Sequence, residues 1–134
     1  MRVFLDSNVP MYVAGSDHAN RAPSLRFLER LRAGDVTVVT STEVLQEILY
    51  RYAGLGRMDL ASEVYDITVQ LCDEVLDVSL ADTDRARDLL QSYPSLSARD
   101  AVHAGVMLTR GLDTIATFDR GFDRLADIRR VELT

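Results

Sequence analysis

Short hydrophobic runs rich in β-branched and aromatic residues alternate along the chain with longer segments of helical periodicity. The short runs predict four to five strands, at residues 2–5, 36–40, 74–78, 113–118 and, at a sheet edge, 130–133. Apolar residues spaced three and four apart predict helices from about residue 8, after Thr40, and over about 22–33, 58–71, 82–92 and 97–110. Strands that alternate with helices indicate an α/β fold whose mainly parallel sheet is covered on both faces.

Residues that start or stop helices mark the boundaries of these elements. Pro10 suits an early helical position, and Gly34 and Gly111 suit positions just after a helix. We expect Asp82 to cap the helix that reaches about Ser92.

Length and composition describe an ordinary globular chain. The 134 residues, 47% apolar and 27% charged, suit one domain over residues 1–134. The single cysteine, Cys72, excludes an internal disulfide, and we expect it to pack within a helix. No apolar stretch approaches the roughly 20 residues that span a bilayer, so we expect a cytoplasmic protein with no membrane partner. The net charge of −6 gives no support to nucleic-acid binding, although grouped arginines could still hold phosphates.

Four acidic residues stand where a parallel sheet brings side chains together. Asp6 follows the first strand and Asp119 follows the strand at 113–118, while Glu47 and Asp100 lie in the opening turns of helices. The carboxyl ends of parallel strands and the helix starts that follow them share one edge of the sheet. Four carboxylates at one edge would repel one another unless a cation held them, so the pattern predicts a metal site.

These acids also have local explanations that involve no metal. A short acidic residue often ends a strand and caps the next helix. Ser97 with Asp100, and Thr40 with Glu43, form capping-box patterns, which assigns Glu43 a structural role. Glu47 has no such local task, and its alternative is a solvated position on the helix surface.

Neighbouring residues leave further roles open. His103 lies three positions after Asp100, where it either supports that carboxylate or simply packs within its helix. Arg120 and Arg124 flank an acidic turn that contains Asp123, and they form surface ion pairs or contact phosphates.

The predicted ligands are all oxygen atoms, since no comparable set of histidines and cysteines and no serine nucleophile motif competes with them. Oxygen ligation favours a hard cation such as Mg²⁺ or Mn²⁺. Such ions serve phosphoryl transfer by activating water and stabilising the attacking and leaving oxygens.

Four ordered stretches, residues 3–8, 40–48, 98–104 and 116–122, resemble PIN-domain ribonucleases, specifically the VapC-type toxins of toxin–antitoxin pairs. The family pattern has an Asp ending the first strand, a Glu six residues after a Ser, an Asp heading a late helix, and an Asp following Thr-x at the next strand end. Asp6, Glu47 (six residues after Ser41), Asp100 and Asp119 occupy these positions, and none is missing. They form the expected catalytic and metal-binding set.

The resemblance implies a three-layer α/β/α domain that holds Mg²⁺ or Mn²⁺ in an acidic pocket. It also implies endonucleolytic cleavage of RNA, inhibition by a cognate antitoxin and, often, homodimerisation. Asp6 and Asp100, with Asp119, would hold the metal directly or through water, and Glu47 would place or deprotonate the attacking water. His103 matches a variant seen in parts of the family and receives no catalytic role.

Two other classes of small acidic α/β protein do not fit the sequence, and one non-catalytic alternative remains open. A receiver-like signalling domain needs an acidic pair at the first strand and a late lysine, and the late strands here contain no lysine. A phosphatase of the Asp-x-Asp type fails because Ser7 and Asn8 follow Asp6. The serious alternative is a non-catalytic PIN-like scaffold that binds protein or RNA.

Overall fold

One parallel sheet forms the centre of the computed structural model, which describes residues 1–34 and 36–134. Its strand order is β3–β2–β1–β4–β5. The strands are β1 (Arg2–Leu5), β2 (Thr37–Ser41), β3 (Glu74–Leu76), β4 (Thr114–Ala116) and β5 (Arg129–Arg130). Every pairing between neighbours is parallel, which confirms the predicted α/β fold with its parallel sheet.

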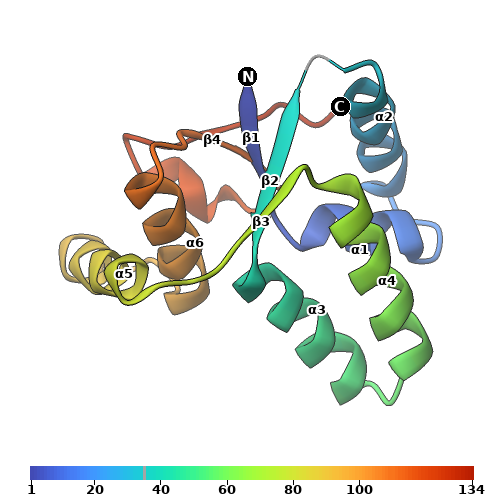
Figure 1. Cartoon of the computed structure of the whole chain (residues 1–134), viewed down its shortest axis with the longest axis horizontal. Helices are drawn as coiled ribbons and strands as arrows, with labels where there is room; N and C mark the ends of the chain where they lie inside the picture. Colours follow the sequence, from blue (N-terminus) through green and yellow to red (C-terminus); the bar gives the residue numbers. More distant parts are fainter. Residues whose placement is uncertain (35) are drawn as a thin grey trace.

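Helices lie on both sides of this sheet, with α5 and α6 on one side and α1 and α2 on the other (Figure 1). Helices α3 and α4 follow each other as an extended hairpin below the sheet in the same view. The helices are α1 (Asn8–Ala14), α2 (Arg21–Arg32), α3 (Thr42–Gly54), α4 (Met58–Leu71), α5 (Leu80–Ser92), α6 (Ala98–Thr109) and the short 3-10 helix η1 (Arg120–Arg124). The three layers predicted by the family resemblance are therefore present.

The alternation of side chains along β1 divides the core into its two parts. Val3 and Leu5 pack with Phe27 of α2 in one hydrophobic cluster, whereas Phe4 packs with Met107 of α6 in the other. The side chains of Val3, Phe4 and Leu5 are fully buried, whereas Arg2 at the start of the strand is exposed. Because successive residues of a strand point to opposite faces, a central strand covered on both sides must be apolar throughout.

The register of β1 positions the first acidic residue. Phe4 pairs with Val39 of β2 on one side and with Ile115 of β4 on the other. The chain leaves β1 towards β2 and returns much later to β4, so the order reverses beside β1. Ligands of open α/β sheets bind at the carboxyl ends of the strands where the order reverses. Asp6 is the residue that follows β1 at this point.

Helix ends agree with the sequence at the glycines but not at two predicted caps. Gly34 and Gly111 have φ angles of 86° and 71°, the left-handed conformation expected just after a helix. The Asp82 prediction is wrong in detail, because Ser79 is the N-cap of α5 and Asp82 completes a capping box from the third helical position. The Thr40–Glu43 box is also wrong: Thr40 lies inside β2, and its hydroxyl donates to the Leu5 carbonyl at 2.8 Å.

Cys72 follows α4 as its C-terminal cap rather than lying within a helix. Burial, with a smaller contribution from the Asp73 carboxylate, raises the pKa of the Cys72 thiol to about 12. The thiol is therefore protonated and unreactive at neutral pH.

Within the described residues, none of the helices combines the length and apolar character needed to cross a bilayer.

Close packing of α5 against α6 depends on Gly105. A Cβ atom at this position would lie 2.4 Å from the Asp82 carbonyl oxygen and 3.1 Å from the Ala86 nitrogen. Both neighbours are backbone atoms, so only a shift of one helix could relieve the overlap. This packing matters for the site because α6 carries Asp100 and His103.

We therefore predict that Gly105→Ala destabilises the fold by about 1–3 kcal/mol, through overpacking that outweighs the better helix propensity of alanine. Chemical denaturation followed by circular dichroism measures this difference. The matched control is Gly54→Ala at the end of α3, where a Cβ meets nothing within 4 Å. The control should stay within about 1 kcal/mol of the unmodified protein, and equal effects of the two changes would contradict the packing argument.

Candidate metal centre

A cavity of about 720 Å³ opens at the carboxyl ends of β1 and β4. All four acids predicted from the sequence line it, together with ten further residues that include His103 and several side chains of α3. The acids come from four segments: Asp6 follows β1, Glu47 lies on α3, Asp100 lies on α6, and Asp119 caps η1. The structure thus brings together the set that the sequence predicted.

Asp6 is the most firmly fixed of these carboxylates and is only 4% exposed. Its backbone N–H donates to the Ala116 carbonyl at 3.1 Å, which continues the pairing of β1 with β4. Its Oδ1 accepts the Ser7 N–H at 2.7 Å, and its Oδ2 accepts the Thr117 hydroxyl at 2.7 Å. Hydrogen bonds to both oxygens hold the carboxylate in one orientation before any ligand binds.

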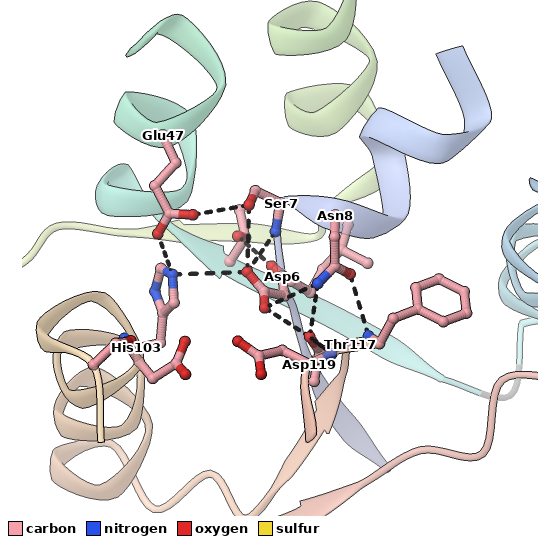
Figure 2. A network of polar contacts seen from close by, with 12 residues as sticks. Asp6, Ser7, Asn8, Glu47, His103, Thr117 and Asp119 are labelled. Carbon is pink, nitrogen blue, oxygen red and sulfur yellow. Dashed lines mark hydrogen bonds and ion pairs between the residues drawn. The ribbon is translucent and has the colours of Figure 1, made fainter. Parts of the chain in front are cut away.

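Asn8 and Thr117 support the acids in a way that the sequence did not reveal. The Asn8 amide donates to the Thr117 hydroxyl at 2.9 Å, and its carbonyl accepts the Phe118 N–H at 3.3 Å (Figure 2). The Thr117 hydroxyl also accepts the Asp119 N–H at 3.0 Å. A polar residue after each of two strands was the available signal, but only the register shows that they meet.

Glu47 lies on α3 and faces the start of α1. Its Oε2 accepts the Ser7 hydroxyl at 2.8 Å, and its Oε1 contacts Nε2 of His103 (Figure 2). Burial raises the pKa of Glu47, but the adjacent His103 and the Ser7 hydroxyl outweigh it and hold that pKa below the usual range. Glu47 is therefore a buried anion, not the solvated surface residue that was its alternative.

Glu43 lies one helical turn before Glu47 and makes no capping hydrogen bond at the start of α3. Its predicted structural role is therefore wrong. Partial burial, and then repulsion from the Glu47 carboxylate, raise the pKa of Glu43.

His103 belongs to the site, although the sequence analysis gave it no catalytic role. Its side chain is 1% exposed, and its Nε2 lies 3.7 Å from Oδ1 of Asp6 as well as against Glu47. It therefore faces the carboxylates of β1 and α3, rather than supporting the Asp100 of its own helix. Burial lowers the pKa of this imidazole, but Glu47 and Asp6 outweigh it and raise the pKa above the usual value. Its spacing from Asp100 gave no sign of this, because the contacts cross between elements.

Asp100 and Asp119 form a second, shallower pair beside the first group. Asp100 is 9% exposed. Burial, repulsion from Asp119 and repulsion from Asp6 raise the pKa of Asp100 to about 7. A Cβ at Gly121 would lie 2.8 Å from Oδ2 of Asp100, and the Gly121 N–H donates to Asp119 at 2.8 Å. The glycine lets the turn approach both carboxylates closely.

Two of the arginines near the site bond to other protein groups, and two others line the cavity. Arg130 pairs with Asp123 through Nε at 2.7 Å, and Asp123 is not among the described residues that line the cavity. Arg124 donates to the Ser95 carbonyl at 3.0 Å. Arg51 of α3 and Arg99 of α6 line the cavity from opposite helices and remain exposed.

The arrangement fits a divalent cation. Ligand atoms of Asp6, Glu47 and His103 lie within 4.8 Å of one another. In the described part of the chain, Oε1 of Glu47 and both ring nitrogens of His103 are buried and make no hydrogen bond of acceptable geometry. Buried polar atoms normally have partners, so unpaired ones that point into an acidic group are the feature expected of a metal site.

We predict that the metal-free protein gains thermal stability as pH falls from about 8 to about 5. The folded state binds a proton at Asp100 near pH 7, whereas the unfolded state binds it only near 3.8, so protonation favours folding between these values. Asp100→Asn should lose much of this dependence, as followed by melting temperature in chelator. An unchanged pH profile in that variant would contradict the raised pKa, and Asp84→Asn on the exposed side of α5 is the control.

Three comparisons with known proteins agree with this geometry. Ribonuclease VapC13 of Mycobacterium tuberculosis is 40% identical over 129 residues, which cover 96% of this chain and 98% of that protein. The crystal structure of VapC20 of M. tuberculosis, described as a sarcin–ricin loop cleaving toxin, superposes with a TM-score of 0.76 at 21% identity and covers 95% and 98% of the two chains. The structure of VapBC2 from Rickettsia felis, bound to a fragment of promoter DNA, gives a TM-score of 0.76 at 20% identity, with 98% of each chain covered.

The family model of the PIN domain matches residues 3–128, which include every acidic residue of the cavity. Its match and the 40% identity to VapC13 both extend over almost the whole chain. The four acids, the order of the strands and these relatives agree: the chain belongs to the PIN domain family, in its VapC group.

Proposed function

We propose that this protein is a metal-dependent endoribonuclease that hydrolyses RNA phosphodiester bonds, and that it is the toxin of a toxin–antitoxin pair. The observation that carries the proposal is the convergence of Asp6, Glu47, Asp100 and Asp119 on one cavity. A scaffold that only binds protein or RNA has no need for buried carboxylates that repel one another. The relative VapC13 is named a ribonuclease, and VapC20 is described as a toxin that cleaves the sarcin–ricin loop.

The four carboxylates are the proposed metal-binding set, with Mg²⁺ or Mn²⁺ as the ion. When bound, the ion supplies a Lewis acid that activates water and offsets charge on the phosphodiester transition state. Asp6 is suited to direct ligation because its two oxygens are already oriented by Ser7 and Thr117. Asp100 and Asp119 would hold the ion from the wall of the cavity, directly or through water.

Glu47 is the proposed residue for the attacking water. Its low pKa keeps it ionised, so it can accept a hydrogen bond from water and orient the oxygen towards phosphorus. As the new P–O bond forms, the water proton passes to a carboxylate of the group. The ester P–O bond on the far side breaks, and the leaving oxygen takes a proton from solvent to become a hydroxyl. The Ser7 hydroxyl, which donates to Glu47, fixes the direction of that carboxylate.

An RNA strand can bind despite the acidic net charge because positively charged arginine side chains lie at the rim of the cavity. Arg51 and Arg99 line the cavity on either side of the acids and are exposed, so both are free to contact phosphates of a bound strand. Tyr50, 75% exposed and also lining the cavity, offers a surface for base stacking. RNA as substrate also fits the cytoplasmic location expected from the sequence.

A cognate antitoxin is the proposed regulator. The solved structure from Rickettsia felis is a VapBC assembly, and one from Salmonella typhimurium is described as VapBC bound to DNA. The acidic cavity would accept a basic segment, whose arginine or lysine would compete with metal for the carboxylates. We propose a homodimer of one-domain chains as the assembly that the antitoxin holds.

Replacing Asp6 with Asn should lower RNA cleavage by at least about 100-fold, because one metal-binding oxygen becomes an amide nitrogen. The measurement is cleavage of a labelled RNA by purified protein in Mg²⁺ or Mn²⁺, with circular dichroism to show that the fold is intact. Asp84→Asn, which removes an equal charge from an exposed site on α5, should cleave normally. Full activity of Asp6→Asn, or of the unmodified protein in excess chelator, would show that the metal-dependent mechanism is wrong.

The toxin assignment has a separate test in cells. Induction of the unmodified protein should arrest growth, and Asp6→Asn should not, because arrest depends on RNA cleavage. Co-expression of a small protein from the neighbouring reading frame, with a DNA-binding start and a basic tail, should restore growth. If the proteins encoded on either side of this gene do not relieve the arrest, the protein is a solitary PIN ribonuclease and the antitoxin proposal is wrong.

A further inference from the structure

His103 is placed as a ligand would be, although the expected metal-binding set of this fold contains only carboxylates. It lines the cavity from α6, and its Nε2 faces Asp6 at the end of β1. Its ring packs against Phe4 with the ring centroids 5.7 Å apart, and its side chain is 1% exposed. The neighbouring Ala101 and Ala104, both fully buried, allow α6 to approach the sheet at this point.

The contact between His103 and Glu47 differs from an ordinary ion pair. Nε2 of His103 lies against Oε1 of Glu47, yet neither atom makes a hydrogen bond of acceptable geometry within the described chain. The ring therefore does not direct its nitrogen along the line to that oxygen. The second carboxylate, Oδ1 of Asp6, lies 3.7 Å from the same nitrogen. Nitrogen and two carboxylate oxygens thus surround a common point (Figure 2).

The charges of Glu47 and Asp6 favour a protonated imidazole, but the geometry does not satisfy the hydrogen bonds of that form. Both of its nitrogens would be donors, and neither finds an aligned acceptor among the described residues. Ligation through Nε2 uses that nitrogen's lone pair and leaves only the Nδ1–H without a partner. A cation held by these residues would also offset the repulsion between Asp6 and Glu47.

We propose that His103 is a direct metal ligand, which together with Asp6 and Glu47 forms an inner cation site with one nitrogen and two carboxylate ligands. This inference rests on the proposed function, since it concerns the same ion. Its consequence is selectivity: imidazole nitrogen favours transition metals over Mg²⁺, which prefers oxygen ligands alone. Mn²⁺ or a later transition metal, rather than Mg²⁺, should be the ion held most tightly.

The deciding experiment uses Mn²⁺ itself as the probe, bound to the purified full-length protein without RNA. Pulsed electron paramagnetic resonance should show a coupled nitrogen in the Mn²⁺ signal, and the coupling should change when only histidine is labelled with ¹⁵N. The chain contains two histidines, so His18→Gln removes the other one. His18 is exposed and stacks on Tyr12 at 4.7 Å, and its replacement should leave the coupling intact.

His103→Gln separates ligation from positioning. Glutamine keeps a donor that can hold Glu47 in place but supplies no ring nitrogen. We expect calorimetry to show Mn²⁺ binding weakened by at least about tenfold, with Mg²⁺ binding changed far less, and the histidine coupling should vanish. If the variant does not fold, the isotope experiment on the unmodified protein decides alone.

The possible failures are distinguishable. Mn²⁺ that binds without histidine coupling, or with equal affinity in His103→Gln, would overturn the role of His103 and leave the metal-dependent nuclease standing. A protein that binds neither Mn²⁺ nor Mg²⁺ would overturn both proposals.

Discussion

The parallel pairing of β1 with β4 is the constraint on which the site depends. It sets Asp6 beside Thr117, and the hydrogen bonds of Asp6, Asn8 and Thr117 then tie the two strand ends together. Helices α3 and α6 bring their carboxylates to this fixed point. Repulsion among the acids works against the arrangement, so the apolar packing on both faces of β1 must hold the ends in place.

Within this frame the acids fall into two groups with different electrostatics. Glu47 is ionised because the histidine and serine around it favour the charged form. Asp100 takes up a proton near neutral pH because burial and two other carboxylates oppose its charge. The repulsion that makes Asp100 hard to ionise also favours a cation bound next to its carboxylate, because the cation offsets the negative charges. Charge at the site is thus balanced either by protons or by metal.

Much of this organisation could be predicted from the sequence. Strand and helix periods gave the layers, and each of the four acids was placed correctly at the strand ends or helix starts. The boundaries were less accurate: the expected strand at 113–118 is only Thr114–Ala116, because the chain turns to build the site at Thr117. The Thr40 cap failed because its hydroxyl bonds the Leu5 carbonyl on another strand, whereas Asp82 does form a local capping box, but from the third helical position because the helix already begins at Leu80.

His103, Asn8 and Thr117 could not be assigned from the sequence for a common physical reason. Each acts through a partner on another element, and no periodicity encodes such a pair. Spacing on α6 linked His103 to Asp100, whereas the fold turns the imidazole towards Glu47 and Asp6. Only the register and the approach of α6 to the sheet reveal it.

The hydrogen bond between Thr117 and Asp6 joins residues 111 positions apart. During synthesis, the strand end that carries Asp6 leaves the ribosome long before β4 exists to complete it. A growing chain that has not yet made β4 therefore lacks the assembled acidic group, because Asp119 follows β4 and Thr117 is not yet present to fix Asp6. This order of assembly follows only from the order of the strands, and under the proposed function it delays any cleavage of RNA until β4 has been made.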